Sequence, residues 1–338
     1  MKKLPVIEDS WRDIYELSKK KVQGDILIAA INWHLFDLMR EPCPVSVIAE
    51  KRQLNQRNLE LFLNCLAGMD LIKKDRGLFS NTQKSNAFLV SSSPSYIGTF
   101  LNFMDAWHGH FAANLEVLVT HGPSAGQTVH TMSDPSVWAK SARDSAACQF
   151  GAAQNMTEIV RCMPEFPGMR KMLDLGGGAG FYTIGIISAH PTMQGVVFDQ
   201  PAVATVARET IKAYGAEDRV SVMAGDYKTD TFGGGYDLVF ASATLNFVKG
   251  SLHDICRKIY DSLNPGGVFI AHQDGITHDR TKPVYHVADT LASEMMGMDL
   301  LLPRGMVADA MLESGFTSVR SFPIESNTGD MDVDIARK

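Results

Sequence analysis

Apolar positions in the first half of the chain recur at the spacing of α-helices. Over residues 24–39 they fall three to four residues apart and cover much of the helix circumference, so we expect a helix buried on several sides. Further helical patterns and one hairpin follow along this half. We expect the helices at 46–52, 56–68, 96–120 and 135–163, and the hairpin at 71–81.

The order helix, turn, helix, hairpin over residues 46–81 is that of a winged helix, a shape that often binds DNA. The helix that would face DNA, 56–68, is mostly apolar and carries one basic residue, Arg57. The chain has 32 Lys and Arg against 38 Asp and Glu, a net charge of -6, whereas nucleic-acid binders carry a positive footprint. We therefore expect this part to serve packing or dimerisation and predict no nucleic-acid partner.

From residue 171 the pattern changes to short apolar strands that alternate with helices, which is typical of a parallel, doubly wound α/β sheet. Residues 163–170 hold two prolines and a glycine and look like a hinge. We predict a mainly helical, winged-helix-like dimerisation and substrate-lid domain over 1–165, and a Rossmann-like domain with a seven-stranded, mostly parallel sheet over 166–338. The strands are expected at 171–175, 195–199, 220–225, 237–242, 267–273, 318–323 and 333–336.

The composition is that of a soluble globular protein, with 45% hydrophobic and 21% charged residues among 338. No run approaches the ~18 apolar residues of a membrane span. The first residues, MKKLPVIEDS, lack the apolar stretch of a signal peptide. Five scattered cysteines form no C-x-x-C pair, which favours reduced thiols over disulfides or zinc. We expect a cytoplasmic protein without a membrane partner.

The most informative segment joins the strand MLDL to a helix through a glycine-rich turn. Asp174 lies in the strand end, and Gly176, Gly178 and Gly180 follow at alternate positions, which does not match the G-x-G-x-x-G of dinucleotide sites. A turn without side chains lets a ligand approach the backbone, and the helix beyond it offers free N–H groups to an anion. An acid beside it suits an ammonium. S-adenosylmethionine (SAM), with its carboxylate, ammonium and sulfonium, fits this pattern.

Two more acids complete a nucleoside site. Asp199 ends the second strand, where a carboxylate can accept hydrogen bonds from ribose hydroxyls. Asp226 follows the third strand and can accept from the adenine amino group, while Tyr227 covers the ring. One strand-end acid alone is often only solvated, but a glycine turn and two acids on consecutive strand ends predict a binding site.

These motifs resemble those of the class I SAM-dependent small-molecule O-methyltransferases, which include caffeate and hydroxyindole enzymes and bacterial relatives acting on aromatic metabolites. LDLGGGAG, VVFDQPAV, GDY, YDLVFASATLNF and LNPGGVFIAHQ resemble the family's successive motifs over nearly the whole length. The resemblance implies the family fold, SAM as methyl donor and a homodimer formed through the amino-terminal domain. It also adds Gln200 and Ser242 to the cofactor site.

The chain departs from the family where plant members place a general-base histidine after the fourth strand, because Asn246 stands there. Gln273 stands where the family commonly places the acid that orients the histidine, and the position of a second family acid falls near Leu301, so all three members of the base apparatus are replaced. We therefore expect catalysis mainly by positioning, with Asn246 and Gln273 as hydrogen-bonding groups. The alternative is that His286, on a Met-rich helix above the site, serves as base.

An apolar acceptor pocket is expected from aromatic side chains and from the stretch Met295, Met296, Met298 and Leu300–Leu302, although each residue can equally belong to the core. The H-G-H sequence at 108–110 has no evident third ligand, so we predict no metal. The leading hypothesis is methyl transfer to a hydroxyl of a small aromatic molecule. Transfer to carbon, nitrogen or sulfur is the alternative, and a non-catalytic SAM-binding or winged-helix regulatory protein is the alternative from another class. The pocket candidates are Phe103, Trp107, Phe111, Phe247, Met295 and Met296.

Overall fold

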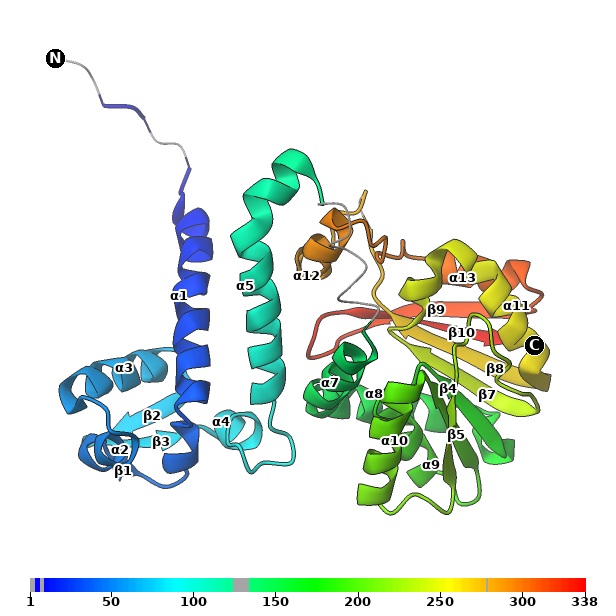
Figure 1. Ribbon diagram of the computed structural model, residues 1–338, viewed down its shortest axis with the longest axis horizontal. Helices are drawn as coiled ribbons and strands as arrows, with labels where there is room; N and C mark the ends of the chain where they lie inside the picture. The colour runs from blue at the N-terminus through cyan, green and yellow to red at the C-terminus, as the bar shows by residue number, and fades with distance from the viewer. Residues whose placement is uncertain (1–3, 7–8, 124–133, 278) are drawn as a thin grey trace. The chain divides into compact units, whose positions relative to one another are not determined.

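The computed structural model describes residues 4–6, 9–123, 134–277 and 279–338. The chain divides into two compact units, Met1–Ala106 and Trp107–Lys338, and helix α5 (Gly98–His121) contains the boundary between them. Figure 1 labels the elements of both units. Within the described residues no helix is both long and apolar enough to cross a membrane.

The first unit begins with α1 (Arg12–Asn32), which is longer toward the N-terminus and ends earlier than the predicted helix over 24–39. The helix stops because His34 adopts a left-handed conformation (φ 49°) and the Leu35 N–H turns back to the Ala30 carbonyl at 3.1 Å. That turn directs Leu35 and Phe36 into the core, where both are fully buried. A helical pattern cannot show such a reversal because the apolar spacing continues through it.

The predicted helix–helix–hairpin order follows. It consists of α2 (Val45–Arg52), α3 (Gln56–Gly68), β2 (Ile72–Asp75), β3 (Leu78–Asn81) and then α4 (Gln83–Phe88). Asn55 begins α3, because its side chain accepts a hydrogen bond from the Asn58 N–H at 3.0 Å. β3 lies between β2 and the short β1 (Cys43–Pro44) in a three-stranded antiparallel sheet. The apolar side of α3 packs on this sheet in a core that includes Leu59, Leu63, Leu66 and Phe79.

The second unit is built on a seven-stranded sheet in the order β6-β5-β4-β7-β8-β10-β9. The first five strands of this order pair in parallel, and β10 is antiparallel to both of its neighbours. The predicted mostly parallel seven-stranded α/β domain is therefore confirmed. Its strands are β4 (Lys171–Leu175), β5 (Gln194–Asp199), β6 (Val220–Ala224), β7 (Tyr236–Ser242), β8 (Leu263–Gln273), β9 (Ser318–Ile324) and β10 (Met331–Arg337).

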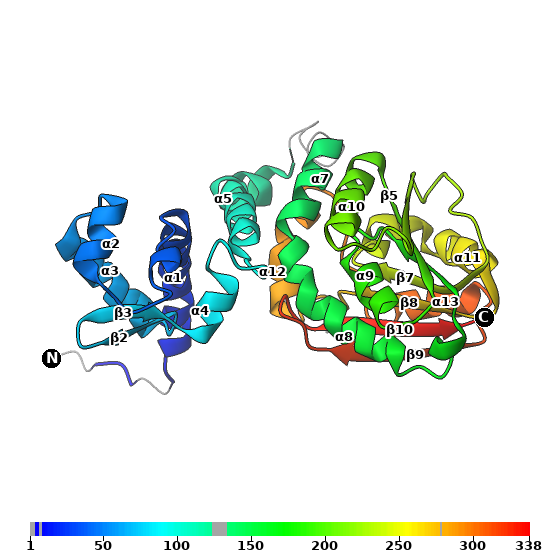
Figure 2. The same cartoon turned by 90° about the horizontal axis from the view of Figure 1, so that it is seen from below.

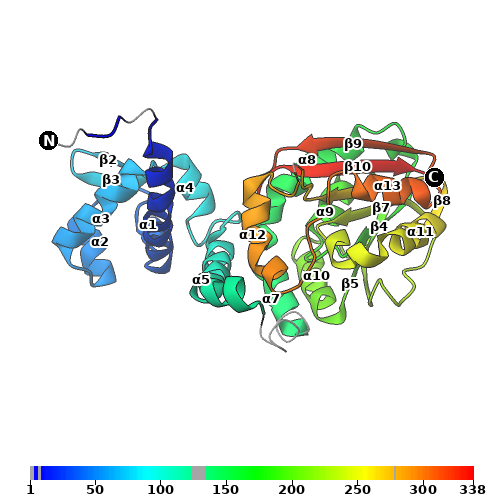
Figure 3. The same ribbon diagram turned by 90° about the horizontal axis from the view of Figure 1, so that it is seen from above.

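Helices cover both faces of this sheet, as Figures 2 and 3 show. One core joins the sheet to α8 (Gln149–Arg161), α9 (Phe181–Ser188) and α10 (Pro201–Ala213). The other joins it to α11 (Leu252–Ser262) and α13 (Met306–Glu313). The remaining helices are α7 (Pro135–Asp144) and α12 (Val284–Met295).

The unit boundary at 106/107 differs from the division at 165/166 expected from the sequence. The reason is that α7 packs against α10 and α8 packs against α9, so both helices belong to the sheet-containing unit. Met156 and Val160 of α8 are fully buried in the core that they share with this sheet. The Pro- and Gly-containing segment that looked like a hinge forms a 3-10 turn, Phe166–Gly168, with Phe166 in the same core.

Candidate active site

The glycine turn between β4 and α9 approaches its neighbours too closely for side chains. Gly176, Gly178 and Gly180 all have positive φ, at 68°, 57° and 86°. A Cβ on Gly176 would lie 2.3 Å from Thr244 Oγ1, and a Cβ on Gly177 would lie 2.8 Å from Asp174 Cγ. Gly180 directly precedes the first turn of α9. The turn therefore presents bare backbone to the space above the strand ends.

Asp174 lies beneath this turn and is almost completely buried, with 1% of its surface exposed. Its Oδ2 accepts a hydrogen bond from Thr183 Oγ1 at 2.7 Å, and its Oδ1 is buried without a partner among the described residues. Burial raises the pKa of Asp174 to about 7, with a smaller contribution from the negative charge of Asp199. A buried carboxylate with one unsatisfied oxygen fits a cationic ligand nearby.

Asp199 anchors the turn from the end of β5. Its Oδ2 accepts from the Gly178 N–H at 2.9 Å, and its Oδ1 accepts from the Gln200 N–H at 2.7 Å. Burial raises the pKa of Asp199, and the two backbone hydrogen bonds oppose this rise. Each carboxylate oxygen keeps a second lone pair, so the group can still accept bonds from a pair of hydroxyls.

Asp226 and Tyr227 follow β6. Asp226 Oδ1 accepts a hydrogen bond from the Lys228 N–H at 2.9 Å, which restrains the carboxylate where it lines the cavity described below. The Tyr227 hydroxyl donates to the Thr244 carbonyl at 3.2 Å, and burial raises its pKa. This bond ties the aromatic ring to the segment that follows β7.

Ser242, at the end of β7, is backed by a buried histidine. Its hydroxyl lies 2.9 Å from His272 Nδ1, and His272 is 1% exposed. Burial lowers the pKa of His272 to about 4, so the imidazole is neutral at pH 7. This ring holds the Ser242 hydroxyl at the edge of the site without placing a charge there.

A cavity of about 1030 Å³ opens above these strand ends. It lies within the second unit and is large for a small-molecule site. Asp174 and Gly180 support the glycine turn from below and are not among its lining residues. The predicted residues that line it are Gly176, Gly178, Asp199, Gln200, Asp226, Tyr227, Ser242, Asn246 and Phe247.

Sequence reasoning missed several lining residues. Trp138 of α7 lies edge-on to Phe247, with ring centroids 5.1 Å apart. Gln149, at the start of α8, lines the cavity with a buried Oε1 that has no partner in the described parts of the chain. Thr244, Lys249 and Asp299 also contribute. Trp138, Gln149, Lys249 and Asp299 lie outside the recognised motifs, whereas Thr244 lies inside YDLVFASATLNF and could have been named.

The candidate catalytic residues lie in different surroundings. Asn246 lines the cavity, and its buried Oδ1 has no partner among the residues described. Gln273 is 3% exposed, and both of its amide atoms likewise lack a described partner. His286 is buried beside the Asp330 carbonyl, 2.6 Å from its Nε2, and Asp274, 3.5 Å from its Nδ1. His286 and Gln273 are not lining residues of this cavity, and all three roles stay predictions.

The residues predicted to form the acceptor pocket differ in whether they line the cavity. Phe247 lines the cavity, whereas Trp107, Phe111, Met295 and Met296 are partly buried and are not lining residues. Phe103 belongs to the other compact unit. Met298 and Leu300, from the same predicted stretch as Met296, line the cavity.

Among the described residues no group of three or more His, Cys, Asp or Glu side chains has the arrangement of a metal site. His108 Nε2 lies 3.6 Å from Asp289 Oδ1, and the His110 side chain lies outside the described part of the chain. The absence of a metal stays an expectation.

The fold and the cavity define a nucleoside-binding α/β domain whose glycine turn and two strand-end acids face one space. The O-methyltransferase domain family matches residues 131–301, just over half of the chain. The protein belongs to this family. The predicted family, the enzyme class and SAM as the methyl donor are confirmed with it.

Individual relatives span most of the chain at low identity. The N,N-dimethyltransferase OxyT of Streptomyces rimosus is 26% identical, covering 83% of each chain. The 3-hydroxy-5-methyl-1-naphthoate 3-O-methyltransferase of Streptomyces sahachiroi is 24% identical over 76% of this chain and 75% of the relative. The crystal structure of human N-acetylserotonin methyltransferase in complex with SAM superimposes with a TM-score of 0.78 at 20% identity, covering 99% of both chains. At this identity the last comparison shows the shared fold.

Proposed function

We propose that the protein transfers a methyl group from SAM to a hydroxyl oxygen of a small, flat aromatic acceptor. One observation carries the proposal. The same cavity has a nucleoside-binding edge, with the glycine turn, Asp199 and Asp226, and an apolar wall, with Trp138 and Phe247. An aromatic ring can pack against such a wall while its substituent faces the methyl donor.

The residues at the cofactor edge fit SAM. A Cβ at Gly176 would lie 2.3 Å from Thr244 Oγ1, so the turn has to stay free of side chains. The charge of Asp174 beneath the turn would favour the ammonium end of a ligand above it. Asp199 would hold the ribose hydroxyls, and Asp226 with Tyr227 would hold the adenine. SAM supplies an electrophilic methyl group on its sulfonium. The chain supplies orientation and a partly enclosed space, which together account for much of the acceleration of such a displacement.

Proton removal does not require a histidine at the usual position. Asn246 can accept a hydrogen bond from the acceptor through its unpartnered Oδ1, but it cannot take the proton. A phenol that is acidic, or already ionised, needs no base, so positioning catalysis favours acceptors with a low hydroxyl pKa. Gln273 would support the same region from the end of β8.

Labelled SAM incubated with phenolic, quinonoid and heteroaromatic acceptors tests the proposal. We expect transfer to at least one phenolic acceptor, with the added methyl located on oxygen by mass spectrometry. Transfer located on nitrogen would favour the alternative suggested by the N,N-dimethyltransferase relative. SAM binding without transfer to any acceptor would favour the non-catalytic alternative.

Asn246→Ala is the sharpest variant for the catalytic assignment. With the acceptor found in the screen we expect kcat to fall about tenfold or more at unchanged SAM affinity, because one hydrogen bond to the reacting oxygen is lost. Asn264→Ala is a matched control. The Asn264 side chain donates to Asp237 Oδ1 at 2.7 Å and is not part of the cavity lining. Wild-type kcat and KM for Asn246→Ala would contradict the role.

We propose that the protein forms a homodimer through its amino-terminal unit. The first half of α1 exposes large apolar side chains, with Ile14 70% and Leu17 66% exposed. Apolar exposure of this extent on one helix is typical of an interface. We expect Leu17→Glu to convert a dimer to a monomer in analytical ultracentrifugation, while Leu312→Glu, at a 50% exposed site on α13, leaves the dimer intact. A monomeric wild-type protein would contradict the proposal.

A further inference from the structure

One wall of the cavity is a segment without regular secondary structure. Met298, Asp299 and Leu300 line the cavity between the end of α12 and the buried Leu302. The segment leaves the helix through Gly297, which has a φ of 84°. At its other end the Leu302 carbonyl accepts from the Ile276 N–H at 3.0 Å. Between these two points the Met298 N–H donates to the Ser293 carbonyl at 2.9 Å and the Leu300 N–H donates to the Met298 carbonyl at 3.0 Å, and charged side chains add further support.

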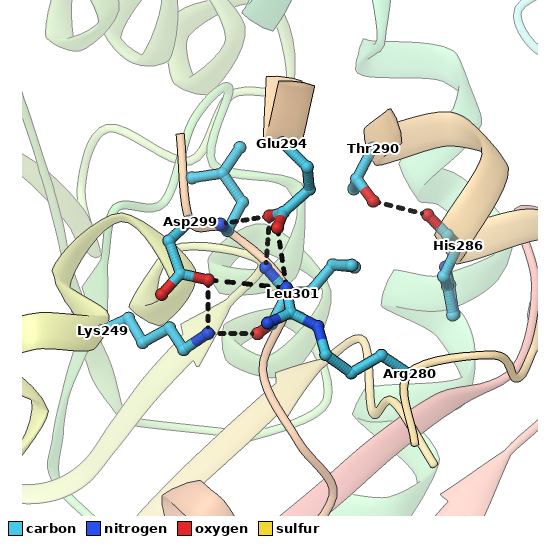
Figure 4. Close-up of polar contacts among 8 residues, drawn as sticks. Lys249, Arg280, His286, Thr290, Glu294, Asp299 and Leu301 are labelled. Carbon is cyan, nitrogen blue, oxygen red and sulfur yellow. Dashed lines mark hydrogen bonds and ion pairs between the residues drawn. The ribbon is translucent and has the colours of Figure 1, made fainter. Parts of the chain in front are cut away.

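Lys249 holds this wall through two hydrogen bonds. Its Nζ donates to Asp299 Oδ1 at 2.6 Å and to the Leu301 carbonyl at 2.7 Å, as Figure 4 shows. The Lys249 side chain is only 13% exposed. It belongs to the 3-10 segment Leu245–Ser251, which also carries Asn246 and Phe247. Asn246, the predicted hydrogen-bonding residue, therefore lies in the same short segment as the lysine that holds the wall.

Glu294 holds the same wall from the last turn of α12. Its Oε1 accepts from the Leu300 N–H at 2.7 Å and from the Leu301 N–H at 3.1 Å. Its Oε2 accepts from Arg280 Nη2 at 2.7 Å, and Arg280 also lies 3.6 Å from Asp299 Oδ1. Lys249, Arg280 and Glu294, from separate parts of the chain, therefore converge on residues 299–301, either on their backbone or on the Asp299 carboxylate. We refer to Lys249, Arg280 and Glu294 as the wall clamp.

Charge and partial burial suit the wall clamp to hold the backbone of this segment in place. Hydrogen bonds that involve a charged partner are about twice as strong as neutral ones, and Glu294 and Lys249 are mostly shielded from water. The hydrogen bond from Lys249 lowers the pKa of Asp299, with help from the nearby positive charges, so this carboxylate stays ionised. Met298 and Leu300, which offer adaptable apolar surface, are held by charges behind them rather than by core packing alone.

We propose that the wall clamp positions Met298, Asp299 and Leu300 as the wall against which the acceptor packs, and that it thereby determines acceptor affinity and not cofactor affinity. This inference rests on the proposed function, because it assumes that the acceptor enters this cavity. Glu294 and Arg280 are not lining residues, so they act through the segment they hold. The cofactor edge lies on β4, β5 and β6 and shares none of these bonds.

Hydrogen exchange of the Leu300 and Leu301 amides tests the clamp directly. We expect exchange at the Leu301 amide to rise about tenfold or more in Glu294→Ala, which removes its acceptor, and less in Glu294→Gln, which keeps an acceptor oxygen but loses the charge. Exchange at Leu300 should rise less, because its N–H also donates to the Met298 carbonyl at 3.0 Å. Arg161→Gln is the matched control, since it removes an ion pair with Glu158 at the far end of α8. Unchanged exchange in Glu294→Ala relative to this control would overturn the proposal.

Binding to 2-naphthol tests the consequence for the acceptor. The protein is saturated with S-adenosylhomocysteine, and 2-naphthol affinity is measured by calorimetry. We expect Kd to rise about fivefold or more in Glu294→Ala and in Lys249→Met, with partial recovery in Lys249→Arg, while the SAM Kd of Glu294→Ala stays within about twofold of wild type. Parallel losses of 2-naphthol and SAM affinity would indicate general damage and overturn the proposal.

The clamp and the proposed function fail in distinguishable ways. A wild-type protein that binds no SAM would contradict the proposed function. The amide exchange would still decide whether the clamp holds the wall, because these hydrogen bonds involve protein atoms only.

Discussion

Asp174 makes the stability of the ligand-free protein decrease as pH rises. In the folded protein its pKa is raised from 3.8 to about 7, because the carboxyl group is buried. A raised carboxyl pKa means that the folded state keeps a proton that the unfolded chain has already lost. Stability is therefore greatest below pH 3.8 as far as this group is concerned, falls as pH rises, and stops falling above about pH 7.

The magnitude follows from the two pKa values. The difference between 3.8 and about 7 corresponds to roughly 4 kcal/mol of lost stability at pH 8, of which more than a third is already lost at pH 5. Asp174→Asn removes the titrating group and keeps an oxygen that can accept from Thr183 Oγ1. We expect the stability of the variant relative to wild type to increase by about 2 kcal/mol between pH 5 and pH 8.

Urea unfolding of both proteins at pH 5, 6.5 and 8 measures this difference, and Asp237→Asn, at a carboxylate beyond the cavity lining, serves as the control. SAM should oppose the effect, because its ammonium favours the ionised carboxylate. We expect SAM affinity to increase with pH between 5 and 7 in wild type and to lose this dependence in Asp174→Asn. Identical pH dependence of stability in the two proteins would refute the reasoning.

Three further predictions concern the cavity. Gly176→Ala should destabilise the protein by about 1–3 kcal/mol in thermal unfolding, since its φ is 68° and its Cβ would meet Thr244 Oγ1; Gly24→Ala, in open space on a helix, should stabilise slightly. Asp199→Ala should weaken SAM binding in calorimetry by about tenfold or more, because the ribose acceptor and the anchor of Gly178 are both lost. Trp138→Ala should raise KM for the aromatic acceptor more than it changes SAM Kd, and equal changes would contradict the proposed wall.

The parts of the fold that the sequence predicted well are those with local causes. Strands such as Lys171–Leu175 consist of short apolar runs between turn residues, and the predicted and observed bounds of this strand agree. The glycine turn was recognisable because positive φ and close approach demand glycine at fixed spacing. Asp199 and Asp226 could be placed together because parallel strands bring their carboxyl ends to one edge.

The parts that the sequence did not predict depend on long-range packing. The reversal after α1, with φ 49° at His34, interrupts a pattern that looks continuously helical. The unit boundary moved because α7 and α8 pack on α10 and α9, and helical periodicity does not show which sheet a helix covers. The sequence placed His286 above the site, but the structure buries it between Asp274 and Asp330.

The sequence by itself determined the α/β alternation, the glycine turn and the acids of the cofactor edge, because each follows from the backbone conformation or hydrogen-bonding capacity of a few neighbouring residues. Only the tertiary structure decided that Asp174 lies under the turn rather than in the cavity, and that Lys249 and Glu294 hold one wall from 45 positions apart along the chain. Burial and the pairing of distant charges depend on how the helices pack over the sheet, and no local pattern of residues contains that information.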